Sequence, residues 1–74
     1  MLISHIKYMD SEENLLIGTS KLIITHELVF SHDSDDNYIQ RKINHYIEQG
    51  FELSEKFIND SGCTTVKLSL TEIS

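Results

Sequence analysis

The chain has 74 residues with twelve carboxylates and six Lys or Arg residues, which give a formal net charge of −6 at pH 7. This length predicts a single domain, residues 1–74, near the lower limit at which a hydrophobic core suffices for folding. The one cysteine excludes an internal disulfide and a zinc site built from several thiolates. Direct binding of nucleic acid is disfavoured, because it needs clustered Lys and Arg side chains.

The cysteine and the apolar runs also indicate the compartment. An unpaired thiol fits a reducing environment, so we expect the protein in the cytoplasm, and in the host cytoplasm if a phage encodes it. The start of the chain lacks the basic residues and the continuous apolar stretch of a signal peptide. Apolar runs such as residues 15–17 and 22–24 are far too short to cross a bilayer.

The first 30 residues predict strands. Residues 10–14 are expected to form a polar turn after a strand at residues 2–9. Gly18 interrupts residues 15–30, which form either two strands around a short turn or one long strand bent at Gly18. One face of the first strand would carry Leu2, Ser4, Ile6 and Tyr8. The later strand alternates more clearly, with one face formed by Leu22, Ile24, His26, Leu28 and Phe30.

The middle of the chain predicts an amphipathic helix. Ser34 or Asp35 can cap its start, and the carboxylates nearby meet the positive end of the helix dipole. The helix runs to about Gln49, where Gly50 can adopt the positive φ that ends a helix. Its apolar face recurs at helical spacing and comprises Ile39, Ile43, Tyr46 and Ile47.

Two more strands are predicted after the helix. Residues 59–62 have the composition of a hairpin turn between them. The strand before this turn spans residues 51–58, with Phe51, Leu53, Glu55 and Phe57 on one face. The strand after it spans residues 64–73, with Val66, Leu68 and Leu70 inward and Thr65, Lys67, Ser69 and Thr71 outward.

This order predicts an α+β fold, an antiparallel sheet of four to five strands with one helix packed on one face. The helix offers only a narrow apolar stripe. We therefore expect Ile3, Ile23 and Val29 on the other face to leave apolar surface exposed. A homodimer through edge strands or through that face is a further expectation.

Residues 39–70 resemble a small bacterial and phage domain of unknown function. In that family a helix ends in a glycine, an aromatic-Glu-Leu sequence follows, and a hairpin comes next. The matching positions are Ile43, Tyr46, Ile47, Gly50, Phe51, Glu52 and Leu53, followed by residues 65–70. The family usually has tryptophan where this chain has Phe51, and this chain lacks its basic C-terminal residue. The resemblance implies the fold and carries no catalytic residues across.

Histidines are the first catalytic candidates, since the chain has four of them. A metal needs at least three converging ligands, and His45 has no second histidine at helical spacing. The segment around His32, Asp33, Asp35 and Asp36 is the best metal candidate, but helix capping explains its carboxylates better. A calcium loop starting at Asp33 fails, because Tyr38 and Asn44 stand at its glycine and glutamate positions.

Nucleophilic and phosphate-binding chemistry also lack support. Cys63 follows Gly62 in the predicted turn with no histidine near it in sequence, although His26 or His32 could approach it in space. The glycines are isolated, so no phosphate-binding loop is present. We therefore expect no catalytic residue, no metal and no cofactor, and keep a small metal-dependent enzyme as the third hypothesis.

The acidic side chains remain as the candidate binding surface. Carboxylates on a rigid small domain can occupy phosphate-binding sites of a basic protein, and exposed aromatic rings can anchor the contact. The predicted partner-binding residues are Glu12, Glu13, Asp33, Asp35, Asp36, Tyr38, Glu48, Glu52 and Glu55. Tyr8 is a further candidate anchor.

These features predict a small non-enzymatic inhibitor from a phage or mobile element. Ile, Asn, Ser and Lys are plentiful while Arg is almost absent, a usage common in AT-rich bacteria and their phages. The expected partner is a basic host protein, such as a nuclease, that handles nucleic acid, blocked as anti-CRISPR or anti-restriction proteins block theirs. Neither direct nucleic-acid binding nor membrane association is expected. The alternative is a self-associating structural or regulatory module without catalytic activity.

Overall fold

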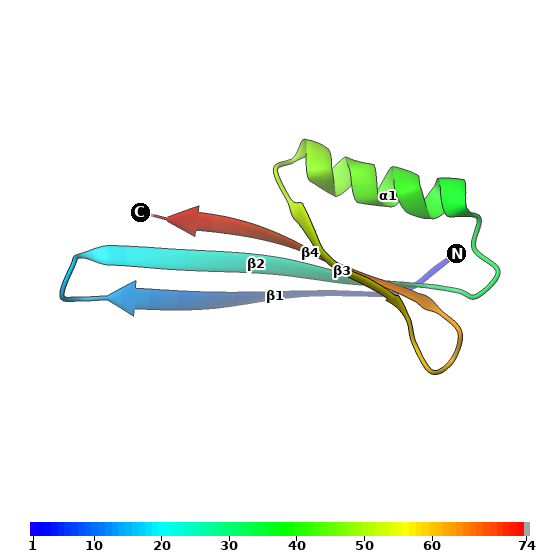
Figure 1. Cartoon of the computed structure of the whole chain (residues 1–74), viewed down its shortest axis with the longest axis horizontal. Helices are drawn as coiled ribbons and strands as arrows, with labels where there is room; N and C mark the ends of the chain where they lie inside the picture. Colours follow the sequence, from blue (N-terminus) through cyan, green and yellow to red (C-terminus); the bar gives the residue numbers. More distant parts are fainter. Residues whose placement is uncertain (74) are drawn as a thin grey trace.

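A computed structural model describes residues 1–73, in which one antiparallel sheet carries one helix on one face (Figure 1). The elements are β1 (Leu2–Asn14), β2 (Thr19–Phe30), α1 (Asp36–Glu48), β3 (Glu52–Ile58) and β4 (Thr64–Ile73). The four strands lie in the order β1-β2-β4-β3, and every neighbouring pair is antiparallel. The predicted α+β class and element order are confirmed. No helix among these residues has the length and apolar character needed to cross a bilayer.

The helix begins and ends where local chemistry predicts. The side chain of Asp35 caps its start by accepting a hydrogen bond of 2.9 Å from the backbone N–H of Asn37. Gly50 has a φ of +100°, which a side chain would strain, and the N–H of Phe51 then donates to the carbonyl of Tyr46. Phe51 thereby folds back over the last helical turn and joins the core.

The core lies between α1 and the middle strands β2 and β4. Ile39 and Ile43 are the buried residues of the helix, whereas Ile47, expected on the same face, is 46% exposed. The wider core consists of Leu28, Phe30, Ile39, Ile43, Phe51, Val66 and Leu68. Because only two helical residues are buried, the helix stabilises a short part of the sheet.

The β1–β2 hairpin extends beyond the helix as an arm (Figure 1), which contains the paired residues 10–14 and 19–23 and the turn between them. The chain measures 49 × 26 × 15 Å and has a radius of gyration of 14.6 Å. A compact domain of this length would have a radius of gyration of about 11 Å. The arm accounts for the elongated shape. The end of β4 pairs with the part of β2 that lies in the arm, up to the pair of Lys21 and Ile73.

The turn of this hairpin lies later than the sequence predicts. Residues 10–14 were expected to form it, but they continue β1 and pair with residues 19–23 of β2. The turn instead occupies residues 15–18, where Asn14 accepts hydrogen bonds from the backbone and Gly18 has a φ of +67°. Residues 15–30 were predicted to form two strands around a short turn or one long strand bent at Gly18. Neither prediction is right in full, since one strand starts at Thr19 and Leu15 to Ile17 belong to the turn.

Two irregularities change which side chains share a face. The register shifts between Leu2 and Ser4, so Leu2 lies opposite Phe30 on the helix side while Ser4 lies opposite Val29 on the far side. The predicted common face of Leu2, Ser4, Ile6 and Tyr8 therefore holds for Ser4, Ile6 and Tyr8 but is wrong for Leu2. A second shift between Leu53 and Glu55 likewise separates Leu53 and Phe51 from Glu55 and Phe57.

The far face of the sheet is partly apolar, as predicted. Thr65 was expected to point outward, and it lies on this face, but it is only 2% exposed. Val29 and Phe57 flank it on the neighbouring strands. Ile3 is exposed and Ile23 is half-buried, so this side of the sheet leaves apolar surface in contact with water.

Ile43→Ala should lower the free energy of unfolding by about 2–5 kcal/mol, because it leaves a cavity between α1 and the sheet. Ile47→Ala is the matched control and should lower it by well under half as much, since its side chain is half in water. Urea unfolding followed by circular dichroism measures both. Equal losses would contradict the packing described.

Candidate partner-binding surface

The end of the arm combines two carboxylates with an exposed apolar turn. Glu12 and Glu13 are the last acidic residues of β1, and Leu15, Leu16 and Ile17 follow them in the turn. All five side chains are exposed, and Leu16 is 97% exposed. Three consecutive exposed apolar residues are unusual in a folded domain unless they serve a function.

The turn holds these side chains outward by a local hydrogen-bond pattern. The N–H of Leu16 donates to the side-chain oxygen of Asn14 at 3.1 Å, and the N–H of Ile17 donates to the same oxygen at 3.4 Å. With Gly18 in the left-handed region, the chain reverses without turning its apolar side chains inward. The apolar turn therefore has a defined backbone conformation.

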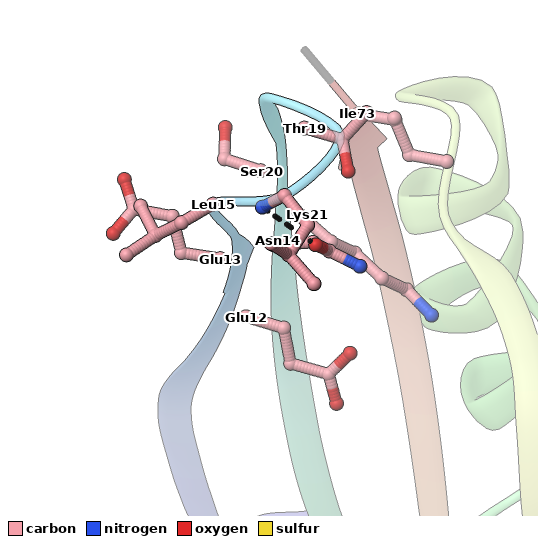
Figure 2. A pocket seen from close by; sticks show the side chains of 9 residues that line it. Glu12, Glu13, Asn14, Leu15, Thr19, Ser20, Lys21 and Ile73 are labelled. Carbon is pink, nitrogen blue, oxygen red and sulfur yellow. Dashed lines mark hydrogen bonds between the residues drawn. The ribbon is translucent and has the colours of Figure 1, made fainter.

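An open recess lies beside this turn, and Figure 2 shows the side chains around it. Glu12 lies directly opposite Lys21 in the ladder, and Glu13 lies opposite Ser20. Ile73 from β4 closes one side. The recess thus offers carboxylates, one ammonium group and apolar surface within a small area.

The second group of predicted binding residues lies at the start of the helix. Asp33, Asp35 and Asp36 are all exposed there, as expected. Asp35 caps the helix. The pKa of Asp33 is lowered mainly by a hydrogen bond from the Ser31 side chain, and a backbone hydrogen bond lowers it further. These carboxylates have a local structural role in the helix start.

The third group is divided by the fold. Glu48 is the last residue of α1, while Glu52 and Glu55 belong to β3. The register shift puts Glu55 on the far face of the sheet, where its carboxylate lies 3.5 Å from the Lys67 ammonium group. Glu52 lies opposite Ser69 on the same far face, so the shift brings Glu52 and Glu55 to one side of the sheet. Glu48 lies apart from them on the helix, and the carboxylate of Glu55 is already paired with Lys67.

The predicted aromatic anchor Tyr38 is not an exposed one. Its ring is half-buried and meets Phe30 edge-on, with centroids 5.8 Å apart. The Lys42 ammonium group lies 5.6 Å from the centroid of the Tyr38 ring. Tyr8, by contrast, is exposed on the far face of the sheet and remains a candidate anchor.

A cluster of His5, His26 and Tyr46 connects β1, β2 and α1. His5 Nε2 and His26 Nδ1 lie 2.8 Å apart, and the Tyr46 hydroxyl lies 3.4 Å from the same nitrogen of His5. His26 also packs against the rings of Tyr46 and Phe51, with centroid distances of 4.8 and 5.1 Å. His26 is therefore a packed histidine at the edge of the core, which agrees with its predicted position on the apolar face.

Burial lowers the pKa of His26, and the nearby charges of His5 and Lys7 lower it further. The pair holds its hydrogen bond only while one of the two facing nitrogens lacks a proton. Protonation of both rings would set two N–H groups against each other.

The remaining candidate residues form no centre of their own. Among residues 1–73, no three His, Cys, Asp or Glu side chains converge as metal ligands, so the carboxylates near His32 do not make such a group. Cys63 is buried beside the β3–β4 turn as a free thiol.

No family model, curated protein or solved structure matches this chain.

The exposed turn at residues 15–18 and the pair of His5 and His26 were not predicted from the sequence. The residue types did favour a turn at this place, since Asn14 and Gly18, which both suit tight turns, flank the three apolar residues. The pair of His5 and His26 had no such signal, because the register between β1 and β2 alone brings the two rings together.

The pKa of His26 predicts a loss of stability in acid. Because folding lowers this pKa below its ordinary value of 6.5, the unfolded chain binds more protons than the folded one just below pH 6.5. The free energy of unfolding should therefore fall as the pH decreases from 7.5 through 6.5 toward the folded pKa. Urea unfolding at a series of pH values measures this dependence.

His26→Gln should flatten this part of the pH profile. His45→Gln is the matched control, since His45 is exposed on the outer side of α1, and it should keep the wild-type slope. The same slope in both variants would assign the pH dependence to other groups.

Proposed function

We propose that this chain is a small phage or mobile-element inhibitor that binds a host nucleic-acid-handling protein through the end of its arm. One observation carries the proposal: Glu12 and Glu13 stand beside three consecutive exposed apolar residues at the tip of an elongated domain. The proposal assigns the chain a binding role, with nucleic-acid mimicry as its electrostatic part.

The charge supports a basic partner. A protein that handles nucleic acid has a groove with a positive potential, and carboxylates can occupy the phosphate positions in it. The chain carries a net charge of −6, which would speed association with such a groove. Salt should weaken the encounter, because ions screen charges over about 8–10 Å at physiological ionic strength.

The apolar turn supports tight contact after the encounter. Residues that contribute most to binding energy are large side chains that lose their water in a pocket of the partner. The β1–β2 turn lies at the narrow end of the molecule (Figure 1). Its exposed Leu15, Leu16 and Ile17 can enter such a pocket. The other two acidic groups contribute less in this proposal, since Asp35 caps the helix and Glu55 is paired with Lys67.

Self-association is the second candidate function. It is favoured by the length of the outer strand β1, which has no strand on its outer side among the described residues. A self-associating structural or regulatory module would use this strand and leave the arm tip without a partner.

A phage-interference assay tests the inhibitor. Bacteria that carry a CRISPR nuclease or a restriction system are challenged with a targeted phage, with and without expression of this protein. We expect expression to raise the plating efficiency of the phage against at least one such defence. Unchanged plating against both classes of nuclease would contradict the proposal.

Variants of the arm locate the contact. Leu16→Asp should weaken binding to the inhibited nuclease about 30-fold or more, since loss of a central anchor costs about 2 kcal/mol or more. Glu12→Lys should slow association and reduce its salt dependence. Asp36→Lys, at the far end of the molecule, is the matched control and should retain binding. Competition with DNA for the purified nuclease is the measurement, after circular dichroism confirms folding of each variant.

A further inference from the structure

The outer side of β1 is a long strand edge. The sheet order places β1 at one edge, and β1 has 13 residues compared with seven in β3 at the other edge. Nothing among residues 1–73 pairs with β1 on that side. Backbone N–H and C=O groups along such an edge can pair with another strand, and proteins usually shorten or cover long edges for that reason.

The charges of β1 are arranged so that a second copy of β1 fits this edge. Its first half carries His5 and Lys7, and its second half carries Asp10, Glu12 and Glu13. His5, Lys7 and Glu13 share the helix face of the strand, whereas Asp10 and Glu12 lie on the far face. An antiparallel second copy therefore brings the two basic side chains of one strand toward Glu13 of the other. A parallel copy would place like charges side by side, which is destabilising.

The charges also select a register. A two-fold axis perpendicular to the sheet keeps directly opposed residues on the same face and leaves both helices on one side. If the two-fold axis passed through Lys7 or Asp10, that residue would face the same residue of the other copy, and the two like charges would repel each other. An axis at Met9 places His5 directly opposite the other copy's Glu13, and Lys7 diagonally from the same carboxylate. Met9, which is exposed, then meets its own copy.

We propose that two copies of this chain pair antiparallel along β1, with Met9 on the two-fold axis, to form one continuous sheet with four strands from each copy. Main-chain hydrogen bonds join the strands, and the two symmetric contacts around Glu13 set the register. The turns at residues 15–18 lie outside the shared ladder and point in opposite directions. The pairing does not depend on the proposed inhibitor function.

Cysteine cross-linking tests the register on the full chain with Cys63→Ala as background. Met9→Cys should form a disulfide-linked dimer under mild oxidation, because opposed Cβ atoms in an antiparallel pair lie within reach of a disulfide. Lys7→Cys alone is the matched control and should stay monomeric on a non-reducing gel. The double variant Lys7→Cys with Ser11→Cys should cross-link, since the two positions oppose each other. Cross-linking of Lys7→Cys without that of Met9→Cys would overturn the register.

Sedimentation of the charge variants tests the electrostatic part. Glu13→Lys and Lys7→Glu should each weaken dimerisation about tenfold, since two symmetric cross-strand contacts become repulsive in each variant. The double variant Lys7→Glu with Glu13→Lys should restore most of the wild-type dimer. A wild-type monomer at all concentrations would overturn the proposal and leave this edge for a strand of another protein. An unchanged dimer in both single variants would also overturn it.

Discussion

The shape of this protein follows from the different rise per residue of helices and strands. Its helix and its longest strand have 13 residues each. A helix of that length spans about 20 Å, whereas a strand spans about 40 Å. One helix can therefore cover only about half of the β1–β2 hairpin, and the core forms where Ile39 and Ile43 meet β2 and β4. The other half of the hairpin becomes an arm.

The arm concentrates the surface that the core cannot bury. Its strands pair with each other, but among the described residues the helix does not reach over them (Figure 1). The turn at its end exposes Leu15, Leu16 and Ile17, and its outer strand leaves a backbone edge in water. The two proposals share Glu13 and otherwise use different parts of the arm. The turn and Glu12 serve a host partner, and the strand edge serves a second copy.

The acidic residues have different roles although they are equal in charge. At the helix start, Asp35 satisfies a backbone N–H that the helix would otherwise leave unpaired. On the far face of the sheet, Glu55 faces the ammonium group of Lys67. At the arm end, Glu12 and Glu13 are exposed beside an apolar turn, and the proposals give Glu12 to a host partner and Glu13 to both contacts.

The sequence by itself determined the elements whose cause lies within a few residues. The cap at Asp35, the glycine that ends the helix, the β3–β4 turn and the last strand were all predictable from local hydrogen bonds and periodicity. The α+β class followed from their order.

Only the tertiary structure decided which residues share a face and which stay exposed. The shifts near Ile3 and Ser54, the extension of β1 through residues 10–14 and the meeting of His5 with His26 depend on the partner strand. Tyr38 on the helix is shielded by Phe30 at the end of β2, and Thr65 lies beside Val29 of the neighbouring strand. Pairing between distant segments sets these features, and the residue pattern of one strand carries no information about the strand it will lie beside.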